Sequence, residues 1–301
     1  MAYKPRTERE EIIILRSLDA RSDLTEEEKW NYLNLKKGYE GEVMFDSLTE
    51  KIKSECLILN DLLLELNNSK FQIDTLIIQE KLFLFDVKNH EGDHYYDNGD
   101  FKSMKTGKLL KNPLDQLKRC ETLFRQLLQK HGYYLPVVSW VVFINPEFTL
   151  YQAPKNEPII YPTQLNTLMK KLNSWSGKLN GKHTKLADLL VSMHIVESPY
   201  PRVPHYEYER LRKRIICSLC QSFVISISGG KIVCDNCGCE EDVDSAVLRS
   251  VKELKLLFPD RKITTSLVQD WCGGIVSVNV IRRILHQNFK TTGTGRWLHF
   301  E

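Results

Sequence analysis

Long apolar runs are absent from this sequence of 301 residues, and no stretch approaches the roughly 18 apolar residues that a membrane helix needs. The N-terminus also lacks the basic-then-apolar order of a signal peptide, because its only apolar run covers residues 12–15. No internal repeat and no low-complexity segment interrupts the chain. We therefore expect a cytoplasmic protein without a membrane partner.

A strong excess of charge is also missing. The formal net charge is +3, which is too small to indicate a nucleic-acid partner by itself, so that argument must rest on local basic clusters. Hydrophobic residues make up 42% of the chain and charged residues 27%, as in ordinary globular proteins. The length favours about two domains, or one medium-sized domain with smaller attachments.

Cysteine is sparse over most of the chain but concentrated in one short segment. Cys56, Cys120 and Cys272 are scattered, and we expect them to be small core residues of a protein in a reducing compartment. The other five lie within residues 217–239, where two C-x-x-C pairs are separated by 13 residues. Alternating residues on both sides of a Gly-Gly turn predict a hairpin between the pairs, which brings four thiols together.

Four thiolates at the base of a hairpin form the closed tetrahedral site that structural zinc occupies. The pattern predicts a zinc ribbon, in which Zn²⁺ supplies much of the folding energy. The predicted ligands are Cys217, Cys220, Cys234 and Cys237. Cys239 is an alternative to Cys237, and disulfides would instead require an oxidising compartment.

Charged side chains interrupt two neighbouring apolar segments within residues 71–88. Successive side chains of a strand alternate between faces, so Asp86 and Lys88 point to one side and Val87 to the other. Pairing of the two segments as a hairpin would bring Asp74 close to them. Carboxylates on apolar strands are costly unless they bind a metal or each other. The pattern predicts a magnesium site beside an ammonium group, which phosphodiester hydrolysis requires.

Two further polar residues are candidates for the same site. Glu42 lies three residues before Phe45, on the inward face of a helix predicted over about residues 41–53. Gln116 follows Pro113, which begins another predicted helix, near backbone amides that favour phosphate. Each candidate alone has a simpler interpretation, such as an exposed Asp-x-Lys ion pair, a strand end or a solvated helix side chain.

Four short segments occur in the order of one known family: GYEGE at 38–42, QIDTLII at 72–78, FDVKNHEG at 85–92 and NPLDQ at 112–116. On these segments the chain, over about residues 36–145, resembles the nuclease-related domain (NERD) family of the PD-(D/E)xK nuclease superfamily. The resemblance implies a restriction-endonuclease-like α/β/α core and a nuclease site that uses Mg²⁺ or Mn²⁺. It also implies the site residues, which are Glu42, Asp74, Asp86 and Lys88, with Gln116 as an auxiliary. The family more often has Glu where this chain has Asp86, and the superfamily accepts either.

The C-terminal segment has the element order of a winged helix. Helices are predicted over residues 247–258, over 265–272 and from Ser277, and residues 291–300 are predicted to form a hairpin. The third helix would then be the recognition helix and the hairpin the wing. The predicted nucleic-acid contacts are Arg282, Arg283, Lys290 and Arg296. A small helical cap or a protein-interaction domain is the alternative.

These patterns divide an α/β protein into five parts. The parts are a helical leader (1–36), the nuclease-like domain (37–197), a linker with a basic approach (198–214), the zinc ribbon (215–242) and a winged-helix-like module (243–301). The leader has a capped helix start at 23–28, and residues 89–112 are predicted to be a polar loop.

The leading functional hypothesis is a metal-dependent nuclease that hydrolyses phosphodiester bonds, with DNA favoured over RNA as the partner. In that hypothesis the zinc ribbon and the winged helix direct the enzyme to its substrate. The alternative is a non-catalytic nucleic-acid-binding or regulatory protein on a nuclease fold. A third hypothesis makes the C-terminal half a protein-docking arm, and both a homodimer and a partner protein stay open.

Overall fold

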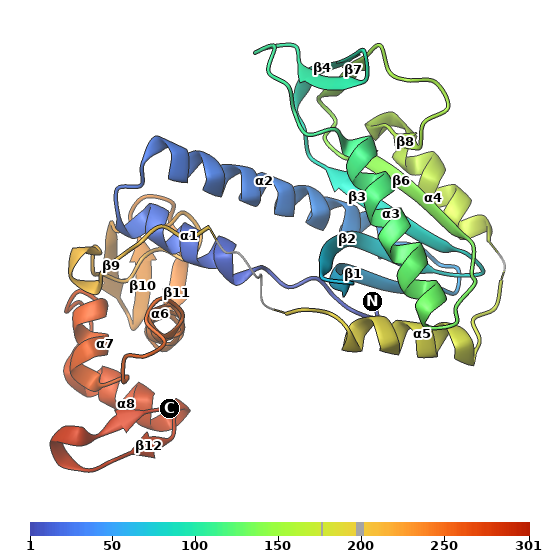
Figure 1. Ribbon diagram of the computed structural model, residues 1–301. Helices are drawn as coiled ribbons and strands as arrows, with labels where there is room; N and C mark the ends of the chain where they lie inside the picture. Colours follow the sequence, from blue (N-terminus) through green and yellow to red (C-terminus); the bar gives the residue numbers. More distant parts are fainter. Residues whose placement is uncertain (176, 197–201) are drawn as a thin grey trace. The chain divides into compact units, whose positions relative to one another are not determined.

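The chain forms two compact units in the computed structural model, which describes residues 1–175, 177–196 and 202–301. Unit 1 contains residues 1–8 and 33–196, and unit 2 contains residues 9–32 and 202–301. Figure 1 colours them along the sequence. No helix among the described residues is long and apolar enough to cross a membrane. The predicted five-part division stays a prediction, and part of its linker, residues 197–201, lies outside the described residues.

Unit 1 is built on a five-stranded mixed sheet. β1, β2 and β3 are antiparallel neighbours, whereas β6 runs parallel to β3 and β8 runs parallel to β6. Both predicted site segments are therefore paired strands. In sheet order the strands are β1 (Leu57–Leu66), β2 (Ser69–Ile78), β3 (Leu82–Lys88), β6 (Val137–Phe143) and β8 (Ile159–Ile160).

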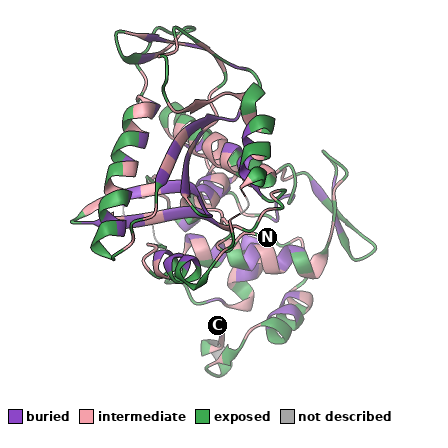
Figure 2. Ribbon diagram, turned by 90° about the vertical axis from the view of Figure 1, so that its right-hand side faces the viewer, coloured by how far each residue is buried: buried purple, intermediate pink, exposed green. Residues whose placement is uncertain are grey.

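Helices cover both faces of this sheet, so unit 1 has the three-layer α/β/α architecture that the sequence predicts. On one face, Phe124 and Leu186 belong to a single apolar cluster with the strands. On the other face a second cluster contains Phe45 and Leu168. The strands in Figure 2 are accordingly buried and the outer faces of the helices exposed. The first pair of helices is α3 (Pro113–Lys130) and α5 (Gly181–Ser192), and the second is α2 (Glu26–Thr49) and α4 (Leu165–Ser174), which the short helix η1 (Pro162–Gln164) precedes.

A second, three-stranded sheet follows β3 directly and extends beyond one end of the main sheet (Figure 1). It contains β4 (Gly92–Asp97), β5 (Asp100–Ser103) and β7 (Phe148–Tyr151). The prediction of a polar loop over residues 89–112 is therefore wrong for residues 92–103, which form a hairpin. The missed signal is the pair Asn98 and Gly99, whose φ angles of 51° and 89° suit the two-residue turn of a hairpin. Buried aromatic rings then hold the hairpin, because His94 stacks on Phe101 with centroids 5.2 Å apart.

The N-terminal helices also differ from the prediction. The structure has α1 (Glu10–Arg21) and then one continuous α2, instead of a leader helix followed by a separate one over 41–53. The capped start is confirmed, since Thr25 Oγ1 accepts from the amide of Glu28 at 3.3 Å and Glu28 Oε2 accepts from the amide of Thr25 at 2.8 Å. Both Gly38 and Gly41 lie inside the helix, where glycine lowers stability but does not end the helix.

Unit 2 combines the cysteine-rich hairpin and the C-terminal helices in one hydrophobic core. The hairpin prediction is confirmed, because Ile225 to Ser228 pairs antiparallel with Lys231 to Cys234. The predicted C-terminal hairpin has only two-residue strands, with a short helix between them. The elements are β9 (Ile225–Ser228), β10 (Lys231–Cys234), β11 (Glu240–Asp242), α6 (Val243–Leu257), α7 (Thr265–Trp271), α8 (Val278–Asn288), β12 (Thr291–Thr292), η3 (Gly295–Trp297) and β13 (His299–Phe300), preceded by η2 (Tyr208–Arg210).

Helix α1 is anchored in the core of unit 2. Leu18 belongs to its apolar cluster, and the buried guanidinium of Arg21 pairs with Glu253 at 2.6 Å. The guanidinium also lies 4.2 Å from the ring centroid of Trp271. A buried arginine is stable only where a carboxylate pairs with it, and an aromatic ring face adds to that stabilisation, so these contacts fix the position of α1. The predicted helical leader is thus part of the C-terminal unit for residues 9–32.

Substitution of the two glycines of α2 should have opposite effects on stability. A Cβ at Gly41 would lie 2.5 Å from Cβ of Asn89, whereas a Cβ at Gly38 would have no atom within 4 Å. We expect Gly41→Ala to lower the free energy of unfolding by about 1–3 kcal/mol through overpacking. The matched control Gly38→Ala should raise it by about 1 kcal/mol through helix propensity. Urea unfolding of both variants tests this, and equal stabilisation by both would contradict the close contact of α2 with Asn89.

Candidate active site and cysteine cluster

The antiparallel pairing of β2 and β3 brings the two strand aspartates together. Thr75 lies opposite Phe85, so Asp74 and Asp86 occupy the next position on the two strands. The Asp74 carboxylate is buried, and its Oδ2 accepts a hydrogen bond of 2.8 Å from the amide of Val87. This bond fixes one oxygen of the carboxylate against the neighbouring strand.

The other oxygen of Asp74 faces a short polar network. Gln72 Nε2 donates to Oδ1 of Asp74 at 3.4 Å and to Oδ1 of Asp61 at 2.9 Å. Asp61 lies in β1 with a φ of 53°, in the left-handed region that side-chain-bearing residues rarely adopt. Neither Asp61 nor Gln72 was predicted as a site residue, because no nearby sequence pattern indicates an aspartate with a strained backbone opposite Asp74.

Asp86 and Lys88 form an ion pair on the same side of β3. Lys88 Nζ donates to Oδ1 of Asp86 at 2.9 Å and lies 2.8 Å from Oδ2. Oδ2 is buried, and the Lys88 ammonium is the one polar contact that the described residues give it. Burial and, to a smaller extent, Asp74 raise the pKa of Asp86 to about 6, against the opposing effect of Lys88.

The ammonium of Lys88 is held in its charged form. Burial lowers its pKa, but the carboxylates of Asp86, Asp74 and Glu42 outweigh burial and hold the pKa above its usual value. All four predicted residues of the motif therefore act on one another electrostatically. Val87, between two of them, packs in the opposite layer with Phe45, as strand alternation predicts.

Glu42 reaches this site from α2, but its carboxylate forms an ion pair with Arg6, a residue that was not predicted. Arg6 Nη1 donates to Glu42 Oε2, Nε donates to Asp46 Oδ2 at 2.8 Å, and Nη2 donates to the carbonyl oxygen of Asp74 at 2.7 Å. The Arg6 side chain is only 3% exposed. Arg6 thus ties two carboxylates of α2 to the backbone of β2.

Residues near Arg6 extend the edge of the main sheet. The amide of Lys4 donates to the carbonyl of Ile58 at 3.1 Å, and the amide of Asn60 donates to the carbonyl of Lys4 at 2.9 Å. Lys4 Nζ also donates to the carbonyl oxygens of Asn60 and Asp61, at 2.8 and 2.9 Å. This strand-like pairing positions Arg6, and no periodic pattern in so short a segment predicts it.

Gln116 lies in the first turn of α3 and is half-buried. The helix begins as predicted, with Asn112 Oδ1 accepting from the amide of Leu114 at 3.0 Å. Within the described part of the chain, the side chain of Gln116 makes no hydrogen bond to the strand carboxylates or to Lys88. A lysine that the sequence analysis did not select, Lys111, acts on Asp86 instead and opposes the rise in its pKa.

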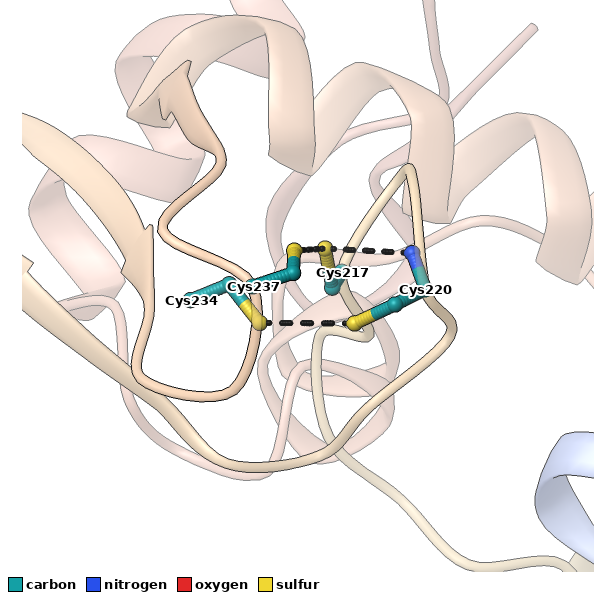
Figure 3. Close-up of side chains that lie close together, drawn as sticks. All are labelled: Cys217, Cys220, Cys234 and Cys237. Carbon is teal, nitrogen blue, oxygen red and sulfur yellow. Dashed lines mark hydrogen bonds between the residues drawn. The ribbon is translucent and has the colours of Figure 1, made fainter.

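The four predicted zinc ligands form one cluster (Figure 3). Their sulfur atoms all lie within 4.8 Å of one another, with 3.6 Å from Cys217 to Cys237 and 3.5 Å from Cys220 to Cys234. Sulfur atoms about 2.3 Å from a tetrahedral zinc ion are about 3.8 Å apart, so these residues fit a zinc site. The side-chain Nδ2 of Asn236 donates to Sγ of Cys220 at 3.5 Å, and this bond, with a backbone hydrogen bond from Ser222, lowers the pKa of that thiol to about 6.

The predicted basic contacts of the C-terminal helices are only partly available. Arg282 and Lys290 are exposed. Arg283 is exposed but pairs with Asp244 at 2.7 Å, which occupies its guanidinium. The side chain of Arg296 lies outside the part of the structure that is described.

Comparison with known proteins finds one family that matches the part of unit 1 with these residues. Residues 37–144 match the nuclease-related domain (NERD) family, and this range contains Glu42, both strand aspartates, Lys88 and the start of α3. The resemblance found from the four sequence segments is thereby confirmed for about a third of the chain. Searches of curated proteins and of solved structures returned no significant match.

Removal of the Arg6 guanidinium should destabilise unit 1. The change Arg6→Ala leaves the side chains of Glu42 and Asp46, which are 12% and 15% exposed, without their cation. Loss of one partner of a buried ion pair costs about 3–5 kcal/mol, and we expect the lower part of that range because both carboxylates retain some solvent. Urea unfolding measures the loss. The triple variant Arg6→Ala/Glu42→Gln/Asp46→Asn should recover part of the stability, and no recovery would contradict a charge-based role.

Proposed function

We propose that this protein is a metal-dependent nuclease whose reaction centre contains Asp74, Asp86 and Lys88. The observation that carries the proposal is the convergence of the Asp74 and Asp86 carboxylates, from facing positions of two apolar strands, on the single ammonium of Lys88. Two carboxylates held close together away from bulk water repel each other, and a divalent cation would offset their charge. The match of this segment to the nuclease-related domain supports the same chemistry.

The donor set fits Mg²⁺ or Mn²⁺. Both are hard cations that prefer carboxylate oxygens. Asp74 Oδ1 accepts a long bond of 3.4 Å from Gln72, and both oxygens of Asp86 contact only the Lys88 ammonium among the described residues. Glu42 is paired with Arg6, so we assign direct coordination to the two aspartates and leave Glu42 as a nearby negative charge. A bound cation would lower the pKa of a coordinated water and offset the charge on the phosphate.

Lys88 supplies the remaining need of phosphodiester hydrolysis. The reaction forms a bond between a water oxygen and phosphorus and breaks the bond to the leaving oxygen, which takes up a proton. Negative charge grows on the phosphoryl oxygens during this step, and the Lys88 ammonium, held charged by its neighbours, can donate hydrogen bonds to them. Asp86 keeps the ammonium in place through the 2.8 Å ion pair.

The C-terminal unit would bind the nucleic acid, with DNA favoured over RNA. Three helices followed by a two-stranded hairpin suggest a winged helix, in which exposed Arg282 and Lys290 would contact phosphates. We also propose that the four-cysteine cluster binds structural Zn²⁺ and stabilises the hairpin of β9 and β10.

Replacement of Lys88 by alanine should abolish most of the cleavage activity and spare binding. Loss of one transition-state donor lowers the rate by about a hundredfold to a thousandfold. We expect this loss for Lys88→Ala with plasmid DNA and Mg²⁺, and an equal or larger one for Asp86→Ala. Binding of a labelled duplex in the presence of a chelator should stay within about twofold of the unmodified protein.

The matched control is Lys170→Ala, which removes an exposed lysine of α4 and should leave cleavage unchanged. Cleavage that persists in Lys88→Ala would refute the assignment of the reaction centre. An unmodified protein that cuts neither duplex, single-stranded DNA nor RNA would favour a binding protein on a nuclease fold.

Loss of one clustered cysteine should release the zinc. We expect the unmodified protein to contain about one zinc ion per chain, and Cys234→Ser to lose it and to destabilise unit 2. Cys239→Ser is the control, because Cys239 lies outside the cluster, with its sulfur 3.7 Å from Oγ of Ser218. Elemental analysis after dialysis measures the zinc content. Retention of zinc by Cys234→Ser, or its loss from Cys239→Ser, would contradict the proposed ligands.

A further inference from the structure

The segment that joins β5 to α3 carries three exposed lysines within seven residues. We call residues 104–111, with the sequence MKTGKLLK, the lysine loop. Lys105, Lys108 and Lys111 are all exposed, and so are the apolar side chains of Met104 and Leu109, at 52% and 64%. The proposed function does not yet use this surface.

The lysine loop is ordered by backbone hydrogen bonds. The amide of Gly107 donates to the carbonyl of Ser103 at 2.8 Å, and the amide of Ser103 donates to the carbonyl of Lys108 at 3.1 Å. Leu109 forms an isolated antiparallel bridge with Lys102 of β5. The three lysines therefore project from a backbone of fixed shape, which lowers the entropy cost of binding.

The loop lies at the end of β3 that carries the reaction centre. At one side, the amide of Met104 donates to the carbonyl of Asp93 at 2.9 Å, and Asp93 follows Lys88 by only five residues. At the other side, Lys111 directly precedes Asn112, the N-cap of α3. Figure 1 shows that the second sheet, to which the loop is attached, extends from this end of the main sheet.

The lysines of the loop lack close carboxylate partners. Within the described ranges, none of the three lysines forms an ion pair. The neighbouring lysines differ, because Lys102 pairs with Asp97 at 2.7 Å and Lys37 pairs with Glu91 at 2.6 Å. Unpaired lysines held together on an ordered loop repel one another, and an anionic partner would relieve this repulsion.

The three lysines are close enough together to contact one nucleic-acid strand. A fully extended chain rises about 3.3 Å per residue, so the three steps from Lys108 to Lys111 span at most about 10 Å. A polyanion with closely spaced charges is therefore a partner that several of these lysines can contact at once.

We propose that the lysine loop binds consecutive phosphates of the nucleic-acid strand that enters the reaction centre, in addition to any contacts made by unit 2. This inference rests on the proposed nuclease function. It assigns the substrate surface of unit 1 to the hairpin of β4 and β5 and to the loop that follows it. Phosphate contacts position the strand without reading its sequence, so binding by the loop is independent of base sequence.

The test measures the salt dependence of binding to a short fluorescein-labelled duplex by anisotropy, with a chelator present to prevent cleavage. Each phosphate contact contributes about 0.9 to the slope of log affinity against log salt concentration. The variant Lys105→Gln/Lys108→Gln/Lys111→Gln should therefore reduce the slope by between about two and three. Circular dichroism of the variant checks that the protein remains folded.

The control variant is Lys170→Gln/Lys182→Gln/Lys185→Gln, which removes the same charge from exposed positions of α4 and α5. It should leave the slope unchanged. An equal reduction by both variants, or an unchanged slope in the loop variant, would overturn the inference. Cleavage by the unmodified protein would still support the nuclease proposal in that case. If the unmodified protein bound no duplex at low salt but cut single-stranded DNA or RNA, the inference would fail and the nuclease proposal would stand.

Discussion

The free-energy cost of burying carboxylates beside one another is the constraint on which unit 1 depends. Asp74 and Asp86 occupy facing positions of two apolar strands, where an uncompensated charge would be strongly destabilising. The protein offsets this cost with the amide of Val87, with Lys88 and with the nearby guanidinium of Arg6. These partners come from β3 and from the N-terminal segment, which Arg6 also ties to α2.

This compensation is incomplete, and that incompleteness distinguishes a site from a structural ion pair. A structural pair matches one carboxylate with one cation, whereas here the Lys88 ammonium lies near two carboxylates, and burial and Asp74 raise the pKa of Asp86 to about 6. The same logic applies to the cysteine cluster of unit 2, where four sulfur atoms converge around a space that fits one tetrahedral cation. In both units, these clustered groups thus lower the folding stability of the metal-free protein, and a bound ion would stabilise them.

Local patterns predicted the strand part of the candidate site, because the alternation of side chains along a strand determines which residues share a face. Alternation along residues 82–88 places Asp86 and Lys88 on one face, and hairpin pairing brings Asp74 beside them, with no need for distant contacts. The cysteine cluster was predictable for a similar reason, since a hairpin closes the two C-x-x-C pairs. The start of α3 followed from Asn112 and Pro113, which are a cap and a first-turn residue.

Features that depend on tertiary contacts were not predictable in this way. Arg6 reaches the carbonyl of Asp74 across 68 residues of sequence, and only the pairing of its segment with β1 positions it. Helix α2 continues through Gly38 and Gly41 because packing overrides the low helix propensity of glycine, and Gly41 admits Asn89. The hairpin of β4 and β5 looked polar because its buried rings are separated by charged and turn residues.

The central claim is that Asp74 and Asp86 together bind a divalent cation. The most direct test is a crystal structure of the protein with Mn²⁺, read from the anomalous signal of the metal. The account predicts a peak in contact with carboxylate oxygens of both aspartates, Oδ2 of Asp86 among them, and no such peak in Asp86→Asn. A Mn²⁺-soaked structure without a peak at this position, with the Asp86–Lys88 pair unchanged, would contradict it.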